Sequence, residues 1–167
     1  MIDPTVRPER PSDRDAVRRV NEAAFGRSDE ADLVDRLRQS EPRYLGLVAD
    51  VGGEVVGHIL FTSITLDAGV DVRGLAPMAV LPDRQRSGVG SALVRAGLSA
   101  CRDDGAEAVV VLGYPAYYPR FGFRPASAFG ITSEYDVPDE AFMALELADG
   151  ALGGASGVVR YSPAFAG

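Results

Sequence analysis

Residues 78–91 decide the fold, and they read Met-Ala-Val-Leu-Pro-Asp-Arg-Gln-Arg-Ser-Gly-Val-Gly-Ser. The apolar run at 78–81 predicts the end of a strand, and the apolar spacing after Gly88 predicts a helix. A loop between them aims backbone N–H groups and the positive end of the helix at one point, which forms a phosphate site without a metal. Gly88 and Gly90 let the backbone approach a bulky anion, because neither carries a Cβ. We therefore expect this loop to bind a diphosphate-bearing cofactor.

Two common phosphate loops are excluded by the residues present. A Walker loop needs Gly-Lys-Ser/Thr, and the chain contains no lysine. A dinucleotide-binding loop needs a third glycine after Gly88 and Gly90, and Leu93 occupies that position. What remains is Gln85-x-x-Gly88-x-Gly90, which taken alone is also compatible with a simple tight turn.

Length and composition bound the class of protein. The 167 residues predict one domain, residues 1–167, with 46% hydrophobic and 25% charged residues. No apolar stretch approaches the roughly 18 residues of a membrane span, and the N-terminus does not resemble a signal peptide, so we expect no membrane partner. The single cysteine, Cys101, fits a reducing compartment, which favours the cytoplasm. A net charge of −7 disfavours nucleic acid and weakly favours a cationic partner.

The hydrophobic periodicity changes along the chain. Residues 6–8 predict a short strand, Ser12 is expected to cap a first helix, and a second helix is expected to begin near Ser28. Three consecutive strands with tight turns are predicted at 44–50, 54–66 and 70–81, which forms an antiparallel meander. The helix after the glycine loop should end near Gly105, and 108–112 is apolar enough for a buried central strand. A short helix or turn at 115–123 and strands at 141–147 and 157–161 complete an α+β, mixed-sheet domain.

This element order, the loop at 85–90 and a tyrosine five residues before Phe123 resemble the GNAT superfamily of N-acetyltransferases over essentially the whole chain. The runs Tyr-Tyr-Pro-Arg-Phe-Gly-Phe (117–123) and Tyr-Ser-Pro-Ala-Phe (161–165) look like those of a bacterial subgroup of predicted N-acetyltransferases. The resemblance implies a mixed, mostly antiparallel sheet of six to seven strands with helices on both faces. It also implies acetyl-CoA as cosubstrate.

The same resemblance implies roles for particular residues. The strand Met78-Ala79-Val80 would bind the pantetheine arm of the cosubstrate through its backbone. Its pyrophosphate would lie on the loop residues Gln85, Arg86, Ser87, Gly88, Val89, Gly90 and Ser91. Tyr118 occupies the position of the general acid that protonates the departing thiolate. One departure is that many members carry an asparagine after the fifth strand, where this chain has Gly113-Tyr114-Pro115.

Acetyl transfer to an amine makes three chemical demands. The amine must lose a proton, because an alkylamine with a pKa of about 10.4 is only about one part in a thousand neutral near pH 7.4. The developing oxyanion needs a donor, which a backbone N–H near Met78 to Val80 supplies. The thiolate needs a proton, which the phenol of Tyr118 delivers, with Tyr117 as the alternative.

Other candidate residues carry weaker signals. His58 is the only histidine and fits a hydrogen-bonded structural role better than a general base, and Glu22 and Asp67 are open alternatives acting through water. Cys101 fits inert packing better than a nucleophile. Arg84 and Arg86 are either nucleotide 3′-phosphate ligands or solvated arginines. No His/Cys cluster has metal-ligand spacing.

Residues suited to line an acceptor site are Glu22, Phe25, Tyr135 and Phe142, with Tyr114 as either acceptor wall or surface.

These observations predict an N-acetyltransferase that moves acetyl from acetyl-CoA to a primary amine by direct attack in a ternary complex. The alternatives are a non-catalytic sensor domain that binds CoA or acyl-CoA, and an interaction domain whose glycine loop is only a turn. The acceptor remains open among polyamine, aminoglycoside, amino acid and protein amine, as does a longer acyl donor. Both a monomer and a homodimer are compatible with the sequence, the latter through an exposed C-terminal strand.

Overall fold

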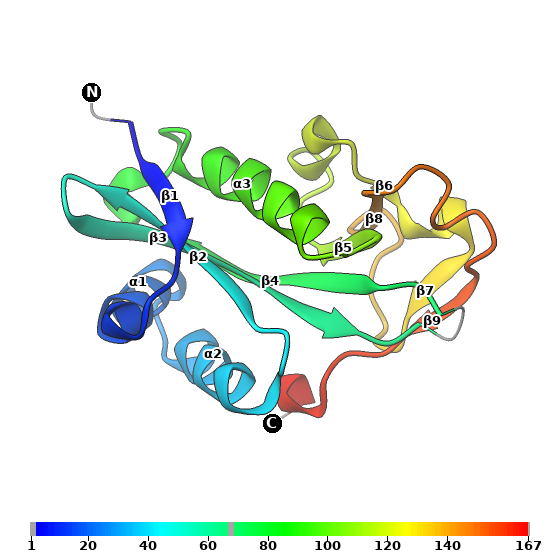
Figure 1. The fold of residues 1–167 in the computed structure, drawn as a ribbon, viewed down its shortest axis with the longest axis horizontal. Helices are drawn as coiled ribbons and strands as arrows, with labels where there is room; N and C mark the ends of the chain where they lie inside the picture. The colour runs from blue at the N-terminus through cyan, green and yellow to red at the C-terminus, as the bar shows by residue number, and fades with distance from the viewer. Residues whose placement is uncertain (1–2, 67–68, 167) are drawn as a thin grey trace.

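The computed structural model describes residues 3–66 and 69–166, which form a seven-stranded mixed sheet flanked by helices and a small two-stranded sheet (Figure 1). In chain order the strands and helices are β1 (Thr5–Pro8), α1 (Arg14–Phe25), α2 (Asp29–Ser40), β2 (Leu45–Val51), β3 (Glu54–Ile64), β4 (Val72–Val80), α3 (Val89–Asp103), β5 (Ala108–Leu112), β6 (Arg124–Pro125), β7 (Ile131–Ser133), β8 (Phe142–Glu146) and β9 (Gly157–Val159). Two short 3₁₀ turns bear on the site: η3 (Tyr118–Phe121) and η5 (Pro163–Ala166).

The main sheet has seven strands in the order β1-β2-β3-β4-β5-β8-β6. Its neighbours are antiparallel except for β4 and β5, which are parallel and are joined through α3. Helix α3 covers one face, and α1 and α2 cover the other (Figure 1). The expected meander is β2-β3-β4, and the expected mixed, mostly antiparallel sheet with helices on both faces is confirmed.

A separate apolar core lies on each face of the sheet. On the α3 face, Leu93 and Val94 pack with Ile59 and Phe61 of β3. Helix α3 comes close to the sheet there, because a Cβ on Gly97 would stand 2.3 Å from Cε2 of Phe61. The other face buries the apolar stripes of both N-terminal helices against alternate residues of β2 and β3. These two cores fix the helices that bear on the site.

The start of α1 differs from the expectation. Ser12 lies inside a 3₁₀ turn, Pro11–Asp13, and α1 begins at Arg14 without a side-chain cap. The reason is the neighbouring carboxylate: Asp13 accepts a hydrogen bond from the backbone N–H of Arg10 at 2.8 Å and is paired with Arg7 at 2.8 Å. Helix α2 begins after Ser28 as expected.

The C-terminal third contains short strands that the hydrophobic pattern did not predict. Strands β6 and β7 have two and three residues, too few for a periodic signal. The expected last strand is present as β9, but it pairs in parallel with β7 in a separate two-stranded sheet. One side of β9 is therefore paired within the chain, and its Gly157 and Val158 are exposed, so pairing with a second subunit stays a prediction.

Candidate active site

A pocket of about 1010 Å³ opens where β4 and β5 part. The two strands pair only from Val72–Ala108 to Leu75–Val111, after which β4 continues alone to Val80. Their divergence leaves a gap between a free strand edge and the segment that follows β5. The lining residues come from five parts of the chain: Phe25, Glu30 and Leu33; Leu75–Met78 and Val80; Gln85, Arg86, Gly88, Gly90 and Ser91; Val111–Tyr114, Ala116–Tyr118 and Arg120; and Phe165.

The free edge of β4 presents backbone groups to this gap. The N–H of Leu81 donates to the carbonyl of Val56 on β3 at 2.9 Å. Because successive residues of a strand direct their main-chain groups to opposite edges, Val80 and Met78 direct theirs toward the gap. The carbonyl of Val80 accepts from Nε2 of Gln85 at 3.0 Å, which joins the loop to the strand end. Backbone donors and acceptors are therefore available along one wall of the pocket.

The glycine loop ends at an uncapped helix. Gly88 is the N-cap of α3 with φ +92°, a left-handed conformation that favours glycine, and no side chain among the described residues caps this end. The first-turn N–H groups of α3 therefore have no intrahelical partner and lie where the positive end of the helix dipole adds to their attraction for an anion. Arg86 adds a cationic side chain and itself has φ +62°. The geometry suits a phosphate, as the sequence predicts.

Seven of the ten predicted cosubstrate-binding residues line the pocket: Met78, Val80, Gln85, Arg86, Gly88, Gly90 and Ser91. The other three do not. Ala79 is buried against α1 and α2, and Val89 is buried in the core beneath α3. The hydroxyl of Ser87 donates to the carbonyl of Arg84 and so closes the loop. For these three, only a backbone role in binding remains a prediction.

Tyr118 lines the pocket from the 3₁₀ turn η3 and is almost completely buried. Its ring packs edge-to-face against Phe123, with centroids 5.7 Å apart. Burial raises the pKa of its phenol to about 12, and Tyr117 and Tyr114 add to the effect. The side chain therefore carries its proton throughout the physiological range. A buried, protonated phenol at the pocket wall can donate a proton to a leaving group.

Tyr117, the alternative general acid, is held in place by contacts with Ser91 and Arg120. Its hydroxyl lies 3.0 Å from Oγ of Ser91 in the first turn of α3. The guanidinium of Arg120 lies over its ring at 4.5 Å from the centroid, and Nε of Arg120 donates to its carbonyl at 2.9 Å. Tyr117 thus connects η3 to the start of α3, which suits positioning rather than proton transfer.

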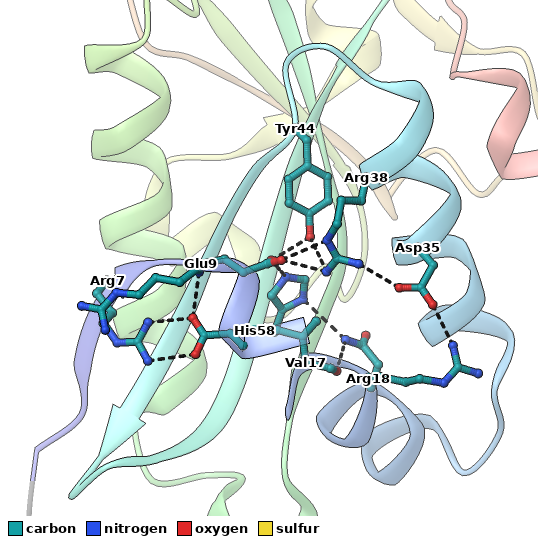
Figure 2. A network of polar contacts seen from close by, with 11 residues as sticks. Arg7, Glu9, Val17, Arg18, Asp35, Arg38, Tyr44 and His58 are labelled. Carbon is teal, nitrogen blue, oxygen red and sulfur yellow. Dashed lines mark hydrogen bonds and ion pairs between the residues drawn. The ribbon is translucent and has the colours of Figure 1, made fainter. Parts of the chain in front are cut away.

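The only histidine of the sequence does not line this pocket. His58 is fully buried on the face covered by α1 and α2, where Nε2 lies 2.8 Å from Oε1 of Glu9 (Figure 2). Glu9 also accepts from Arg38 at 2.7 Å and from the hydroxyl of Tyr44 at 2.7 Å. Burial alone raises the pKa of Glu9, but hydrogen bonds from His58, Tyr44 and Arg38 outweigh it and lower the value to about 2. The structural role that the sequence favours for His58 agrees with this network.

Several weaker candidates are likewise placed away from the pocket. Cys101 lies on the buried face of α3, and burial raises the pKa of its thiol to about 12, which leaves it unreactive. Glu22 does not line the pocket, and Asp67 lies outside the described residues. Arg84 is half exposed, with Nη2 3.9 Å from Oε1 of Glu54.

The expected acceptor-lining residues need correction. Phe25 does line the pocket, and the exposed Tyr114 lies at its wall. Phe142 is buried in the sheet opposite Leu112, and Tyr135 packs near Tyr161 with centroids 5.7 Å apart. Among the lining residues that the sequence reasoning missed are Glu30 and Leu33 of α2, Arg120 of η3 and Phe165 of η5.

Residues 3–66 and 69–166 contain neither a cluster of metal ligands nor a membrane-spanning helix. No group of three or more His, Cys, Asp or Glu side chains there is arranged to hold a metal ion. Within the same residues, none of the helices has the length and apolar character needed to cross a membrane.

Comparison with known proteins assigns the chain to a family. Residues 14–123 match the model of the acetyltransferase (GNAT) family. The uncharacterized N-acetyltransferase YjhQ of Escherichia coli K12 is 44% identical over 135 residues, 77% of this chain and 75% of the relative. The uncharacterized N-acetyltransferase YhbS of the same strain is 36% identical over 163 residues, 96% of this chain and 97% of the relative.

Two solved structures are similar over nearly their whole length. The crystal structure of YhbS from Escherichia coli in complex with CoA has a TM-score of 0.92 at 34% identity and covers 100% of this chain and 94% of its own. A GNAT family acetyltransferase from Brucella melitensis in complex with acetyl-CoA has a TM-score of 0.80 at 35% identity and covers 99% of both chains. The chain belongs to the GNAT family of acetyltransferases. It is an acyl-CoA-dependent enzyme, and acetyl-CoA is the cosubstrate of its family.

Proposed function

We propose that this enzyme transfers acetyl from acetyl-CoA directly to a primary amine bound in the same pocket. The observation that carries the proposal is the continuity of the pocket. It runs from the uncapped start of α3, along the free edge of β4, to Phe25 and Leu33 on the first two helices. A single space that holds both the donor and the acceptor favours attack in a ternary complex, since no acyl-enzyme is then needed.

The cosubstrate fits the pocket in one direction. Its pyrophosphate lies at the loop and the N-terminus of α3, near Arg86, because these groups are positive. The pantetheine arm is amide-bearing, and it runs along β4, where Val80 and Met78 offer backbone partners in the manner of an added strand. This places the thioester near the point where β4 and β5 part.

The reaction then requires stabilisation of the oxyanion, protonation of the leaving thiolate and loss of a proton from the attacking nitrogen. The neutral amine attacks the thioester carbonyl, and a backbone N–H of the β4 edge stabilises the oxyanion. Collapse of the tetrahedral intermediate breaks the C–S bond, and Tyr118 donates its proton to the departing thiolate sulfur. The new amide nitrogen releases its extra proton to solvent, and the phenolate of Tyr118 is reprotonated. The sequence and the pocket single out no general base, so water accepts the amine proton in this scheme.

Catalysis is favoured over a sensor role by Tyr118. A binding module needs the phosphate site and the strand edge but not a buried, protonated phenol at the pocket wall. For the remaining features we propose a cytoplasmic enzyme without a nucleic-acid or membrane partner, consistent with a reduced Cys101 and a net charge of −7. The enzyme acts as a monomer or a homodimer, and sedimentation velocity distinguishes the two.

Calorimetry and a transfer assay test the proposal together. Titration of the purified protein with acetyl-CoA, and separately with CoA, should give micromolar binding. Thiol release should then appear on addition of amines and should require both substrates at once. Binding without thiol release from a broad amine panel would favour the sensor alternative, and no binding at millimolar cosubstrate would leave the pocket without its proposed ligand.

A further inference from the structure

The two ends of the pocket carry opposite charge. Arg86 and Arg120 line the end formed by the glycine loop and η3. Among the described lining residues, Glu30 in the first turn of α2 supplies the only carboxylate. The cosubstrate phosphates occupy the positive end in the proposed function, so Glu30 faces the half of the pocket left for the acceptor.

Glu30 is suited to binding a positive charge rather than to removing a proton. Its carboxylate accepts two hydrogen bonds from Arg27. Nε of Arg27 donates to Oε1 of Glu30 at 3.0 Å, and Nη2 donates to Oε2 at 2.6 Å. This hydrogen bonding from Arg27 lowers the pKa of Glu30, so the group stays ionised at neutral pH. A carboxylate of this kind against the reacting nitrogen would hold it as an unreactive ammonium ion. Glu30 therefore fits a second cationic group on the acceptor.

There is space beside Glu30 for such a group. A side cavity of about 420 Å³ adjoins the main pocket and shares three lining residues with it, namely Glu30, Leu33 and Phe165. Its other lining residues are Asp29, Asp32 and Arg36. Arg36 is directed to the C-terminal turn, where its Nε donates to the carbonyl of Ala164 at 3.2 Å.

The wall between the two spaces comes from the end of the chain. The turn η5 lies beside α2 (Figure 1), and its Phe165 packs edge-to-face on Tyr161 with centroids 5.2 Å apart. These residues fall outside the part of the chain, 14–123, that matches the family model. The wall therefore comes from a part of this chain that lies outside the match to the family model.

We infer that the acceptor is an amine with a second positively charged group, which binds at Glu30 where Leu33 and Phe165 join the main pocket to the side cavity. The inference rests on the proposed function and specifies its substrate class as diamine-like. In the free enzyme Arg27 is paired with the carboxylate of Glu30. Its side chain is 60% exposed, so an incoming cation can displace it.

Matched amines test this inference. The probes are α,ω-diamines of three to eight carbons, each with the monoamine of the same length, assayed by thiol release. The wild-type enzyme should favour diamines over monoamines by at least tenfold in kcat/KM at one or more lengths. Glu30→Gln should remove this preference by raising the KM for diamines about tenfold, the effect of losing one charge-assisted hydrogen bond, with little change for monoamines. Asp15→Asn removes one exposed charge from α1 and should leave the preference intact.

A second variant works in the opposite direction. Arg27→Ala frees the carboxylate of Glu30 and should lower the KM for diamines several-fold while leaving that for acetyl-CoA unchanged. Equal turnover of diamines and monoamines, or an unchanged preference in Glu30→Gln, would refute the inference and leave the transferase function standing. Absence of transfer to every amine despite acetyl-CoA binding would instead remove the proposed function, and this inference with it.

Discussion

Gly113 and Tyr118 are fitted to each other: a Cβ added to Gly113 would stand 2.3 Å from Cε2 of the Tyr118 ring. No Cβ is tolerated at that distance, so the ring occupies its place only because residue 113 is a glycine. Gly113 lies in the stretch where many relatives are expected to carry an asparagine. The departure from that pattern therefore coincides with the packing of the proposed general acid.

This contact predicts the effect of Gly113→Ala. The added methyl group should displace the Tyr118 ring and lower kcat at least tenfold, with a smaller change in the KM for acetyl-CoA. Overpacking of this kind also lowers the free energy of unfolding by about 1–3 kcal/mol. Steady-state kinetics and thermal unfolding measure the two effects. Gly154→Ala, at an exposed turn with open space around its Cβ position and no left-handed φ, controls for the substitution itself.

Tyr118→Phe should lower kcat about 10²-fold if the phenol protonates the thiolate, because general acid catalysis contributes that much or more. The ring and its packing are retained, so the KM for acetyl-CoA should change little. Tyr117→Phe is the matched control: it loses the contact with Ser91 but should keep most of kcat. The reverse pattern would assign the acid role to Tyr117.

The pH dependence of kcat tests the same assignment. Burial raises the pKa of Tyr118 to about 12, so the proton needed for donation is present below that value and is lost only as the pH rises through it. The wild-type enzyme should show no alkaline decrease in kcat from Tyr118 up to about pH 10.5. A decrease centred near pH 10 would indicate an ordinary, exposed phenol in its place.

Gly88→Val should weaken cosubstrate binding for a reason that is not steric crowding. A Cβ at Gly88 meets nothing within 4 Å, but φ is +92°, which an L residue adopts only with strain. The loop should therefore rearrange and displace the first N–H groups of α3, raising the Kd for acetyl-CoA and CoA alike by at least tenfold. Calorimetry measures this, and circular dichroism establishes that the fold is retained. An unchanged Kd would place the pyrophosphate elsewhere.

The sequence predicts those parts of the fold and the pocket whose residues lie close together along the chain. The strand, the loop and the helix of residues 78–103 have strong local patterns, so these elements were predictable, whereas phosphate binding by the loop stays a prediction. Glu30 and Phe165 are 135 positions apart and meet only through packing of the C-terminal turn on α2, for which no local pattern exists. The prediction that Ser12 caps α1 was wrong, because Asp13 pairs with Arg7 of β1 and holds residues 11–13 in a 3₁₀ turn.

Glu9 also escaped the sequence reasoning, and it predicts how stability depends on pH. In the folded protein its pKa is lowered to about 2 from an ordinary value of 4.5, because hydrogen bonds from His58, Tyr44 and Arg38 outweigh the effect of burial. A group whose pKa is lower in the folded state stabilises it fully above the unfolded pKa. That stability is lost as the pH falls from about 4.5 toward 2.

Glu9→Gln should therefore lower the free energy of unfolding at pH 7 by about 3 kcal/mol, because Arg38 loses its buried carboxylate partner and keeps only the more exposed Asp35. The variant should also lose part of the wild-type decrease in stability between pH 4.5 and 2. Urea unfolding at pH 7, 4.5 and 3 measures both effects. Glu41→Gln, for which no ion pair is found among the described residues, is the control. Equal pH dependence in Glu9→Gln and wild type would show that other carboxylates dominate acid unfolding.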